Sequence, residues 1–198
     1  MRLFFIASLL TGWSITVAAA NWPAWRGPSD KGASEESKFP TSWNRTNNVV
    51  WRIDLPEPGN SSPIVWNDRV FVTQAIGKNR ALLCFDRKDG RKLWEAGPVY
   101  DLPERIIKGN NTYCAASPVT DGERVIAFFG SAGLYCFDFQ GKEEWHTELG
   151  KIDHQFGSAS SPCLEGEQCY VYVGPGTNET MVAVNKRSGK IAWRTNAA

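Results

Sequence analysis

The stretch GNSSPIVWNDRVFVTQAIGKNRALLCFDRKDGRKLW, from Gly59 to Trp94, decides the fold because its pattern recurs twice downstream. Each copy opens on small residues that end in Ser-Pro. Each copy closes on an acidic or amide residue, a Gly and a Trp at near-fixed spacing. The later copies are CAASPVTDGERVIAFFGSAGLYCFDFQGKEEW, which ends at Trp145, and SASSPCLEGEQCYVYVG with MVAVNKRSGKIAW, which ends at Trp193. The chain is therefore a repeat protein.

Each repeat divides into four short β-forming runs separated by turn residues. In the first repeat the runs are SSPIVW, RVFVTQ, ALLCF and KLWEA. A period of about 50 residues with four antiparallel strands per unit is typical of a β-propeller blade. Helical periodicity is absent from the sequence. We therefore predict an all-β protein with three complete blades, at about residues 60–97, 115–150 and 158–195, as the front part of a ring of about seven or eight blades.

The third turn of each repeat carries an Asp or Asn, then a Gly, then a Trp. The Asp or Asn side chain can cap the turn while the Gly takes a positive φ. The Trp that follows lies on the outermost strand, where its ring can be buried against a neighbouring blade. The residues assigned to this structural docking role are Trp51, Trp94, Trp145 and Trp193. The run around Trp51 predicts an outermost strand over 47–55 that has no inner strands of its own.

This pattern resembles AxDxxxGxxxW, the tryptophan-docking repeat of the pyrroloquinoline-quinone-like (PQQ-like) propeller superfamily. That superfamily includes eight-bladed quinoprotein dehydrogenases and the BamB-type scaffold of outer-membrane assembly. Among the three repeats only Ala183 keeps the Ala, and only Asp86 and Asp138 keep the Asp. The opening NWPAWRGPSDKG, residues 21–32, is similar to that of secreted PQQ-like proteins of bacteria such as planctomycetes. The resemblance implies the fold across nearly the whole mature chain and assigns no reaction to it.

The first 20 residues have the features of a secretory signal peptide. Arg2 precedes an apolar run from Leu3 to Val17, and three Ala residues then form a small-residue cleavage site. A run of about fifteen residues is shorter than the roughly 20 that a membrane-spanning helix needs. We expect cleavage near Asn21, a secreted or periplasmic protein without a membrane span, an N-terminal arm at 21–46 and a partial propeller at 47–198.

The net charge of the chain argues against one class of partner. A formal charge of +1 gives no electrostatic reason to bind nucleic acid.

Five Cys residues cannot all pair within one chain. Cys84 and Cys136 share one repeat position, which predicts a small buried role for both. Cys163 and Cys169 flank a hairpin loop. A three-residue loop would set them opposite each other for a disulfide, whereas a two- or four-residue loop would put them on opposite faces.

Quinone chemistry is not expected from this chain. The resemblance implies that a quinoprotein dehydrogenase would carry a Ca²⁺ site, a catalytic Asp and, in many members, a disulfide between adjacent cysteines. The sequence contains no Cys-Cys dipeptide, no acidic cluster with calcium-loop spacing and no Cys or His pair with zinc-ligand spacing. We therefore predict no catalytic residue, no metal site and no cofactor, PQQ with Ca²⁺ included.

Ligand contacts are expected where the chain enters each innermost strand, because these segments line the channel of a propeller. The candidate channel-lining residues are Asn60, Ser61, Asn111, Tyr113, His154 and Ser158. The alternative is that small residues are needed there because strands crowd the axis. Likewise Trp22, Trp25 and Arg26 form either an aromatic face for a cation or a sugar, or an arm that packs over a groove.

The sequence as a whole favours a non-catalytic binding scaffold for a protein or a small molecule. Two alternatives remain open at this stage. One is the N-terminal part of a PQQ-dependent oxidoreductase whose catalytic blades lie beyond Ala198. The other is the sensor ectodomain of a signalling protein.

Overall fold

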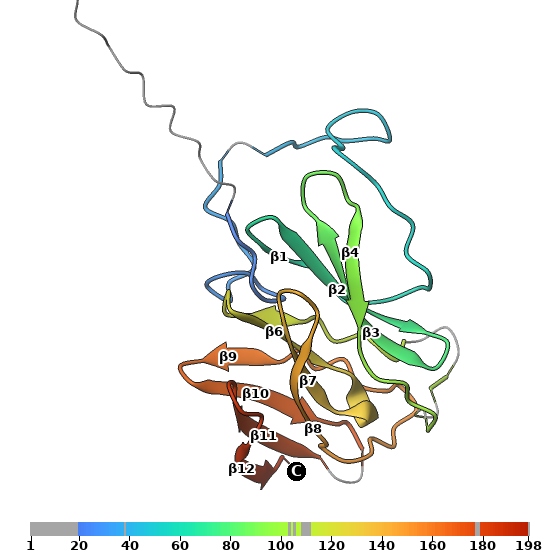
Figure 1. Cartoon of the computed structure of the whole chain (residues 1–198), viewed down its shortest axis with the longest axis vertical. Coiled ribbons are helices and arrows are strands. Elements are labelled where there is room, and N and C mark those ends of the chain that lie inside the picture. Colours follow the sequence, from blue (N-terminus) through green and yellow to red (C-terminus); the bar gives the residue numbers. More distant parts are fainter. Residues whose placement is uncertain are drawn as a thin grey trace, which may run out of the picture.

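Three four-stranded antiparallel sheets follow one another along the chain (Figure 1). The computed structural model describes residues 20–37, 39–102, 104, 106–107, 112–176 and 179–197. Blade 1 contains β1 (Ile64–Trp66), β2 (Arg69–Ile76), β3 (Asn79–Asp86) and β4 (Lys92–Ala96). Blade 2 contains β5 (Val119–Thr120), β6 (Arg124–Phe128), β7 (Leu134–Asp138) and β8 (Glu143–Thr147). Blade 3 contains β9 (Cys163–Glu165), β10 (Gln168–Val173), β11 (Thr180–Asn185) and β12 (Ile191–Asn196).

These sheets confirm the predicted all-β fold of four-stranded blades. In the described part of the chain the single helical element is η1 (Gly130–Ala132), a short 3-10 turn. Strands lie in chain order within every blade, and the Trp-bearing strand is the last of the four. All three blades also share a register shift opposite that strand, at Cys84/Phe85, Cys136/Phe137 and Ala183/Val184. The predicted signal peptide, 1–20, lies outside the described residues except for Ala20.

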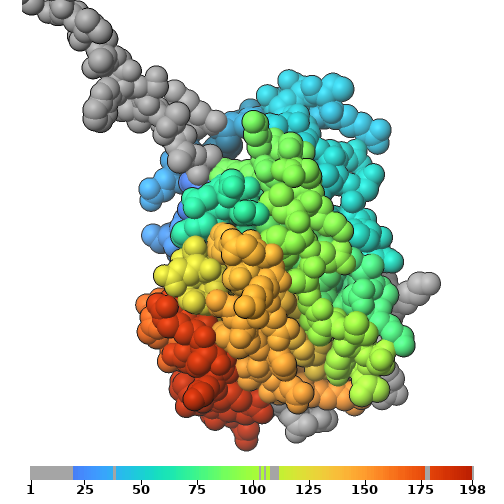
Figure 2. Space-filling view, viewed as in Figure 1, coloured from blue at the N-terminus to red at the C-terminus, as the bar shows by residue number. Residues whose placement is uncertain are grey.

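The hydrophobic core lies between blades. Phe71 and Leu82 of blade 1 pack with Val125 and Phe137 of blade 2. In the same way, blade 2 packs against blade 3 through a second cluster that includes Trp145 and Val171. We call the face that a blade turns toward the next blade its forward face, and the opposite face its reverse face. Figure 2 shows the blades as successive bands, from green through yellow and orange to red.

The Trp residues cross these interfaces by a repeated hydrogen bond. Each indole Nε1–H donates to a backbone C=O in the third turn of the following blade, one residue after the Asp or Asn. The three bonds are Trp51 to Arg87 at 2.7 Å, Trp94 to Phe139 at 3.0 Å and Trp145 to Lys186 at 3.1 Å. In each turn the Asp or Asn also accepts a bond from the backbone N–H two residues later, at 2.8, 2.9 and 3.1 Å.

The predicted outermost strand over 47–55 is wrong. None of these residues is in a strand, because a strand needs a neighbour to pair with, and none of the described strands pairs with this stretch. Trp51 and Ile53 nevertheless pack on the reverse face of blade 1, against a cluster that includes Val72 and Phe85. The segment thus occupies the place of a preceding blade without forming its sheet.

All five cysteines are free thiols. The loop between β9 and β10 has two residues, Gly166 and Glu167, so Cys163 pairs with Tyr170 while Cys169 pairs with Leu164. Neighbouring positions along a strand pair point to opposite faces of the sheet. Of the two alternatives for these cysteines, the structure has the one without a disulfide.

Candidate functional site

A ladder of serines runs across the three blades where the chain enters each innermost strand. The Ser62 N–H donates to Ser117 Oγ at 2.9 Å, and the Ser117 N–H donates to Ser161 Oγ, also at 2.9 Å. All three residues are the Ser of a Ser-Pro pair. A hydroxyl on a short side chain reaches the neighbouring backbone, which a larger side chain would displace. The ladder therefore explains the Ser of the Ser-Pro pairs in blades 2 and 3.

The N-terminal arm lies along the inner edge of blades 1 and 2. Trp22 and Val65 exchange two backbone hydrogen bonds, both of 2.8 Å, and the Pro23 C=O accepts from the Thr120 N–H at 2.9 Å. The Asn21 side chain accepts from the Asn67 N–H at 2.7 Å. Trp22 is thus part of an arm that packs on the blades, whereas Trp25 has 58% of its surface exposed.

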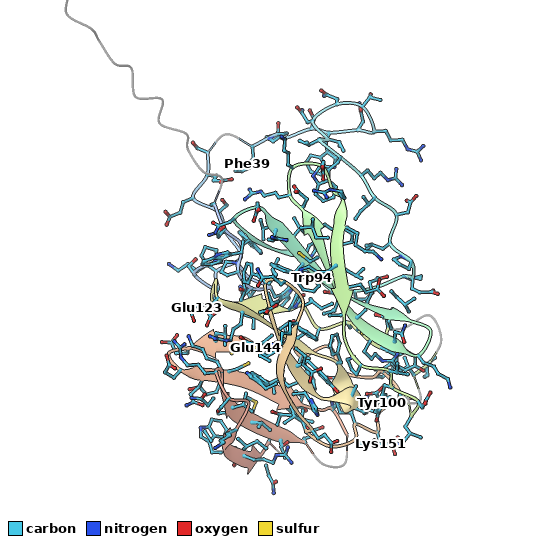
Figure 3. The ribbon with its side chains drawn as sticks, in the orientation of Figure 1. Phe39, Trp94, Tyr100, Glu123, Glu144 and Lys151 are labelled. Carbon is cyan, nitrogen blue, oxygen red and sulfur yellow. The ribbon has the colours of Figure 1, made fainter. Side chains whose placement is uncertain are left out.

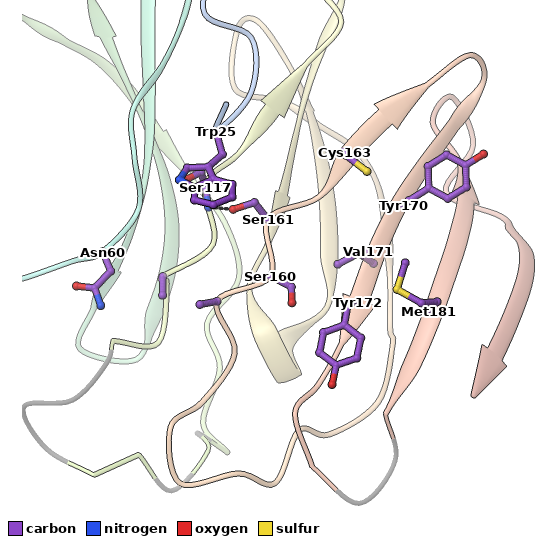
Figure 4. A pocket seen from close by; sticks show the side chains of 12 residues that line it. Trp25, Asn60, Ser117, Ser160, Ser161, Cys163, Tyr170, Val171, Tyr172 and Met181 are labelled. Carbon is purple, nitrogen blue, oxygen red and sulfur yellow. Dashed lines mark hydrogen bonds between the residues drawn. The ribbon is translucent and has the colours of Figure 1, made fainter. Parts of the chain in front are cut away.

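Beyond the arm, a half-open pocket of about 440 Å³ lies between blades 2 and 3 and Trp25. Figure 4 shows Trp25 next to Ser117 and Ser161, with side chains of blade 3 beside them. The lining residues carry no formal charge; they are Trp25, Asn60, Ala115, Ser117, Ala159, Ser160, Ser161, Cys163, Tyr170, Val171, Tyr172 and Met181. A neutral pocket with aromatic walls and a few hydroxyl groups suits an uncharged ligand or peptide segment.

The pocket side chains of blade 3 belong to its forward face, except for Val171, which belongs to the reverse face. Along β10, Cys169, Val171 and Val173 are buried against blade 2, whereas Tyr170 and Tyr172 alternate with them and are half-buried. Phe71 holds the place of Tyr170 in blade 1 and is fully buried because blade 2 covers it. No described segment covers this face of blade 3, which leaves its aromatic side chains accessible.

The predicted channel-lining residues do not form one site. Asn60 lines the pocket, and Ser61 Oγ accepts from the Thr73 N–H at 3.2 Å. His154 lies elsewhere, in a shallow depression of about 540 Å³ with Ile106 and Ile107, and its Nδ1 accepts from the Phe156 N–H at 3.3 Å. Ser158 is buried, and its Oγ has no hydrogen-bond partner among the described residues. Asn111 lies outside the described residues.

The sixth candidate, Tyr113, contacts a buried cation that the sequence did not reveal. Its ring centroid lies 4.5 Å from Arg80 Cζ, and the ring of Tyr100 lies 6.0 Å away on the same guanidinium. Arg80 is only 1% exposed, and its Nε has no partner among the described residues. Aromatic faces attract a desolvated cation. Because Arg80 follows the polar turn Gly77 to Asn79, nothing in the sequence marks it as buried.

A cluster of charges joins blades 2 and 3 away from the pocket. Asp121 lies 3.2 Å from Lys186 Nζ and 3.5 Å from Arg124, and all three side chains are at most 14% exposed. Burial acts to raise the pKa of Asp121, but backbone N–H groups of Glu123 and Arg124 and the Lys186 ammonium outweigh it. The pKa therefore lies below its usual range. Figure 3 labels Glu123 and Glu144, which also contact Arg124.

The side chains that line the pocket do not fit a Ca²⁺-bound quinone. Ca²⁺ takes six to eight oxygen ligands, usually with several carboxylates, yet the pocket has no carboxylate in its lining. Within the described ranges, no group of three or more His, Cys, Asp or Glu side chains is placed to hold a metal ion. The described residues also contain no helix that is long and apolar enough to span a membrane.

Comparisons with known proteins agree with this architecture. Among solved structures, the quinohemoprotein alcohol dehydrogenase of Comamonas testosteroni has a TM-score of 0.64 at 15% identity, over 90% of this chain and 28% of that one. A europium-containing methanol dehydrogenase has a TM-score of 0.51 at 15% identity, over 67% and 24%. BamB from Moraxella catarrhalis has a TM-score of 0.50 at 13% identity, over 74% and 39%. These identities establish a likeness of fold alone.

The chain spans between 24% and 39% of the length of these structures. No curated protein matches it significantly. The sequence profile of one family, described as outer membrane protein assembly factor BamB, matches residues 40–155 and 84–198. Because that profile covers most of the chain, and the sheets repeat one Trp-bearing pattern, the chain belongs to the BamB family of PQQ-like β-propeller repeat proteins.

Proposed function

We propose that this chain belongs to a secreted or periplasmic propeller that binds another polypeptide and performs no catalysis of its own. The observation that carries the proposal is the neutral pocket beside the forward face of blade 3, which joins Trp25, Tyr170, Tyr172 and Met181. Aromatic residues and Met are enriched in the cores of protein interfaces, and charged residues are depleted there. The family to which the chain belongs is described as an assembly factor, which also supports the binding of another polypeptide.

The second candidate is part of a quinone-dependent oxidoreductase. It is favoured by the likeness of fold to two alcohol-oxidising enzymes. Against it stand the carboxylate-free pocket and the missing Cys-Cys dipeptide. Catalysis by other parts of a longer protein would leave this chain with a structural or binding role.

Site-specific photo-crosslinking in the native cell tests the proposal. A benzophenone amino acid replaces Met181 in the pocket and, as a control, Lys88 in an exposed turn of blade 1. We expect one discrete polypeptide adduct from position 181 and none from position 88. The adduct partner, once purified, should bind the purified chain, and Tyr172→Glu should weaken that binding. Stoichiometric uptake of PQQ with Ca²⁺ and reduction of an electron acceptor, without any adduct, would establish the oxidoreductase instead.

A further inference from the structure

The innermost strands of the three blades present the same backbone groups to the channel. Val65, Thr120 and Leu164 hold one position, paired with Val70, Val125 and Cys169 respectively. In an antiparallel pair, alternate residues turn their N–H and C=O away from the neighbouring strand. Val65 does so, because both of its backbone groups bond to Trp22. The shared register gives Leu164 the same orientation, toward the open edge of β9.

The arm bonds to this edge on the first two blades, whereas no backbone bond joins it to β9 among the described residues. Beside β9 the arm contributes side-chain packing only: Ala24 and Leu164 pack against the core between blades 2 and 3, and Trp25 lines the pocket together with Cys163. Trp22 covers Val65 through two hydrogen bonds, and Pro23 accepts from Thr120. Outside the pairing of β9 with β10, no backbone hydrogen bond of Leu164 is found among the described residues. Cys163 and Glu165, on either side of it, are exposed. The backbone positions that the arm bonds on blades 1 and 2 thus have a counterpart on blade 3, Leu164, to which the arm makes no backbone hydrogen bond.

We propose that a partner polypeptide adds an extended segment to the inner edge of β9 and bonds through its backbone to the N–H and C=O of Leu164. This inference rests on the proposed function and specifies its mode of recognition, which is addition of a strand to an exposed sheet edge. The interface is continuous with the one that the arm already makes on blades 1 and 2. The arm therefore serves as an internal example of the segment that this edge accepts.

The surroundings of β9 define the side chains of that segment. Cys163 is part of the aromatic pocket, so a large apolar residue next to the bonded position enters it. Glu165 and Asp30 place negative charge close to Cys163, which favours Lys or Arg at a flanking position. The fitting partner is an extended peptide with one aromatic or large aliphatic residue and a neighbouring basic residue.

The probe is a synthetic peptide with the sequence of residues 20–32, which supplies Trp22 and Arg26. Added in excess to the whole chain, it is followed by residue-resolved hydrogen exchange. We expect the Leu164 amide to become at least about tenfold more protected, as a new backbone hydrogen bond requires. Val65, which the arm already covers, serves as the internal reference and should change little.

Two variants at one position separate the backbone bond from the side chain. Leu164→Pro removes the N–H, and proline is tolerated on an edge strand where that group points outward. Leu164→Ala keeps the N–H. We expect Leu164→Pro to weaken peptide binding about tenfold and Leu164→Ala to weaken it less than about threefold. Circular dichroism melts verify that both variants fold. If a variant does not fold, a peptide that is N-methylated at the bonded position is used with the unmodified chain, because it lacks the N–H that would donate to the Leu164 C=O.

Three results would overturn the inference. They are unchanged protection at Leu164, equal binding by the two variants, and protection confined to Tyr172 and Met181 on the forward face. In that last case the proposed function would stand, because the crosslinked partner would still bind at the pocket. If no partner is crosslinked and the peptide still protects Leu164, the edge is a peptide site and the scaffold proposal loses its support.

Discussion

Trp94 lies so close to Gly141 of the next blade that a methyl group cannot be added between them. A Cβ built on Gly141 would come within 2.7 Å of Trp94 Cδ2, and φ of this glycine is +86°. Gly90 stands in the same relation to Trp51, and Gly189 to Trp145. The Gly of each third turn is therefore needed for two reasons, the left-handed backbone and the approach of the indole ring.

Gly141→Ala should lower the free energy of unfolding by about 2–4 kcal/mol, because strain at a positive φ and overpacking against Trp94 act together. Gly166→Ala is the matched control. Its φ is +56°, but no atom lies within 4 Å of the added Cβ, so about 1 kcal/mol is expected. Urea denaturation of both variants measures the difference. Equal losses would show that the indole contact adds nothing to the backbone strain.

Trp145→Ala should cost about 3–5 kcal/mol, the usual range for an aromatic residue removed from a core. Trp145 is 8% exposed and donates to the Lys186 C=O in blade 3. Trp193 holds the same repeat position but is 44% exposed, so Trp193→Ala should cost less than about 1.5 kcal/mol. Thermal or urea melts of the two variants decide this. Comparable losses would mean that Trp193 is covered in solution.

The sequence predicted the blades because their signals are local. The third turn requires Gly141 and the strand after it requires Trp145, so the spacing between the two residues is fixed in the sequence and does not depend on the surrounding structure. The error over 47–55 has a related cause, since the Trp51 contact needs an indole ring and a turn but no sheet. Asn60 and Trp25, two residues of the pocket lining, were among the sequence candidates, but the blade 3 wall was missed because the exposure of a side chain is not a local property. Tyr170 and Phe71 hold equivalent positions, and only the presence of a following blade buries one and not the other.

Asp121 should make the stability of the protein depend on pH. Its pKa is lowered in the folded state, so its stabilising contribution is fully present above the unfolded value of about 4 and is lost as the pH falls through the lower folded pKa. Asp121→Asn should therefore cost about 1–3 kcal/mol at pH 7 and much less at about pH 2. Asp68→Asn, at a carboxylate that is 77% exposed, is the control and should change little at either pH. Thermal melts of the wild type and of Asp121→Asn measure this dependence. The same loss of stability at low pH in both proteins would contradict the role of Asp121.

Only Cys163 should react with iodoacetamide in the native protein. It is exposed, whereas the other four thiols are buried. Burial raises the pKa of Cys84 to about 11 and that of Cys114 to about 12, and the thiolate is the reactive form. Mass spectrometry should find one label per chain at pH 8, and five after denaturation. A ligand in the pocket should slow labelling of Cys163. More than one rapid label in the native state would show that a blade interface opens.

The forward face of blade 3 should make the isolated chain self-associate. Tyr172 and Met181 are accessible there, and Trp193 on the neighbouring strand β12 is 44% exposed and contacts the ring of Tyr170. Contiguous apolar surface of this kind drives association, whereas single scattered residues do not. Met181→Glu places a charge in the centre of the patch and should shift the protein toward monomer in sedimentation velocity. Leu102→Glu removes a hydrophobic residue that is 71% exposed. It follows Asp101, which pairs with Lys78 in the β2–β3 turn of blade 1, so this variant should leave the association unchanged. A wild-type chain that stays monomeric from micromolar to near-millimolar concentration would show that exposure of this face does not cause association. Loss of association in both variants would assign it to general hydrophobicity and not to blade 3.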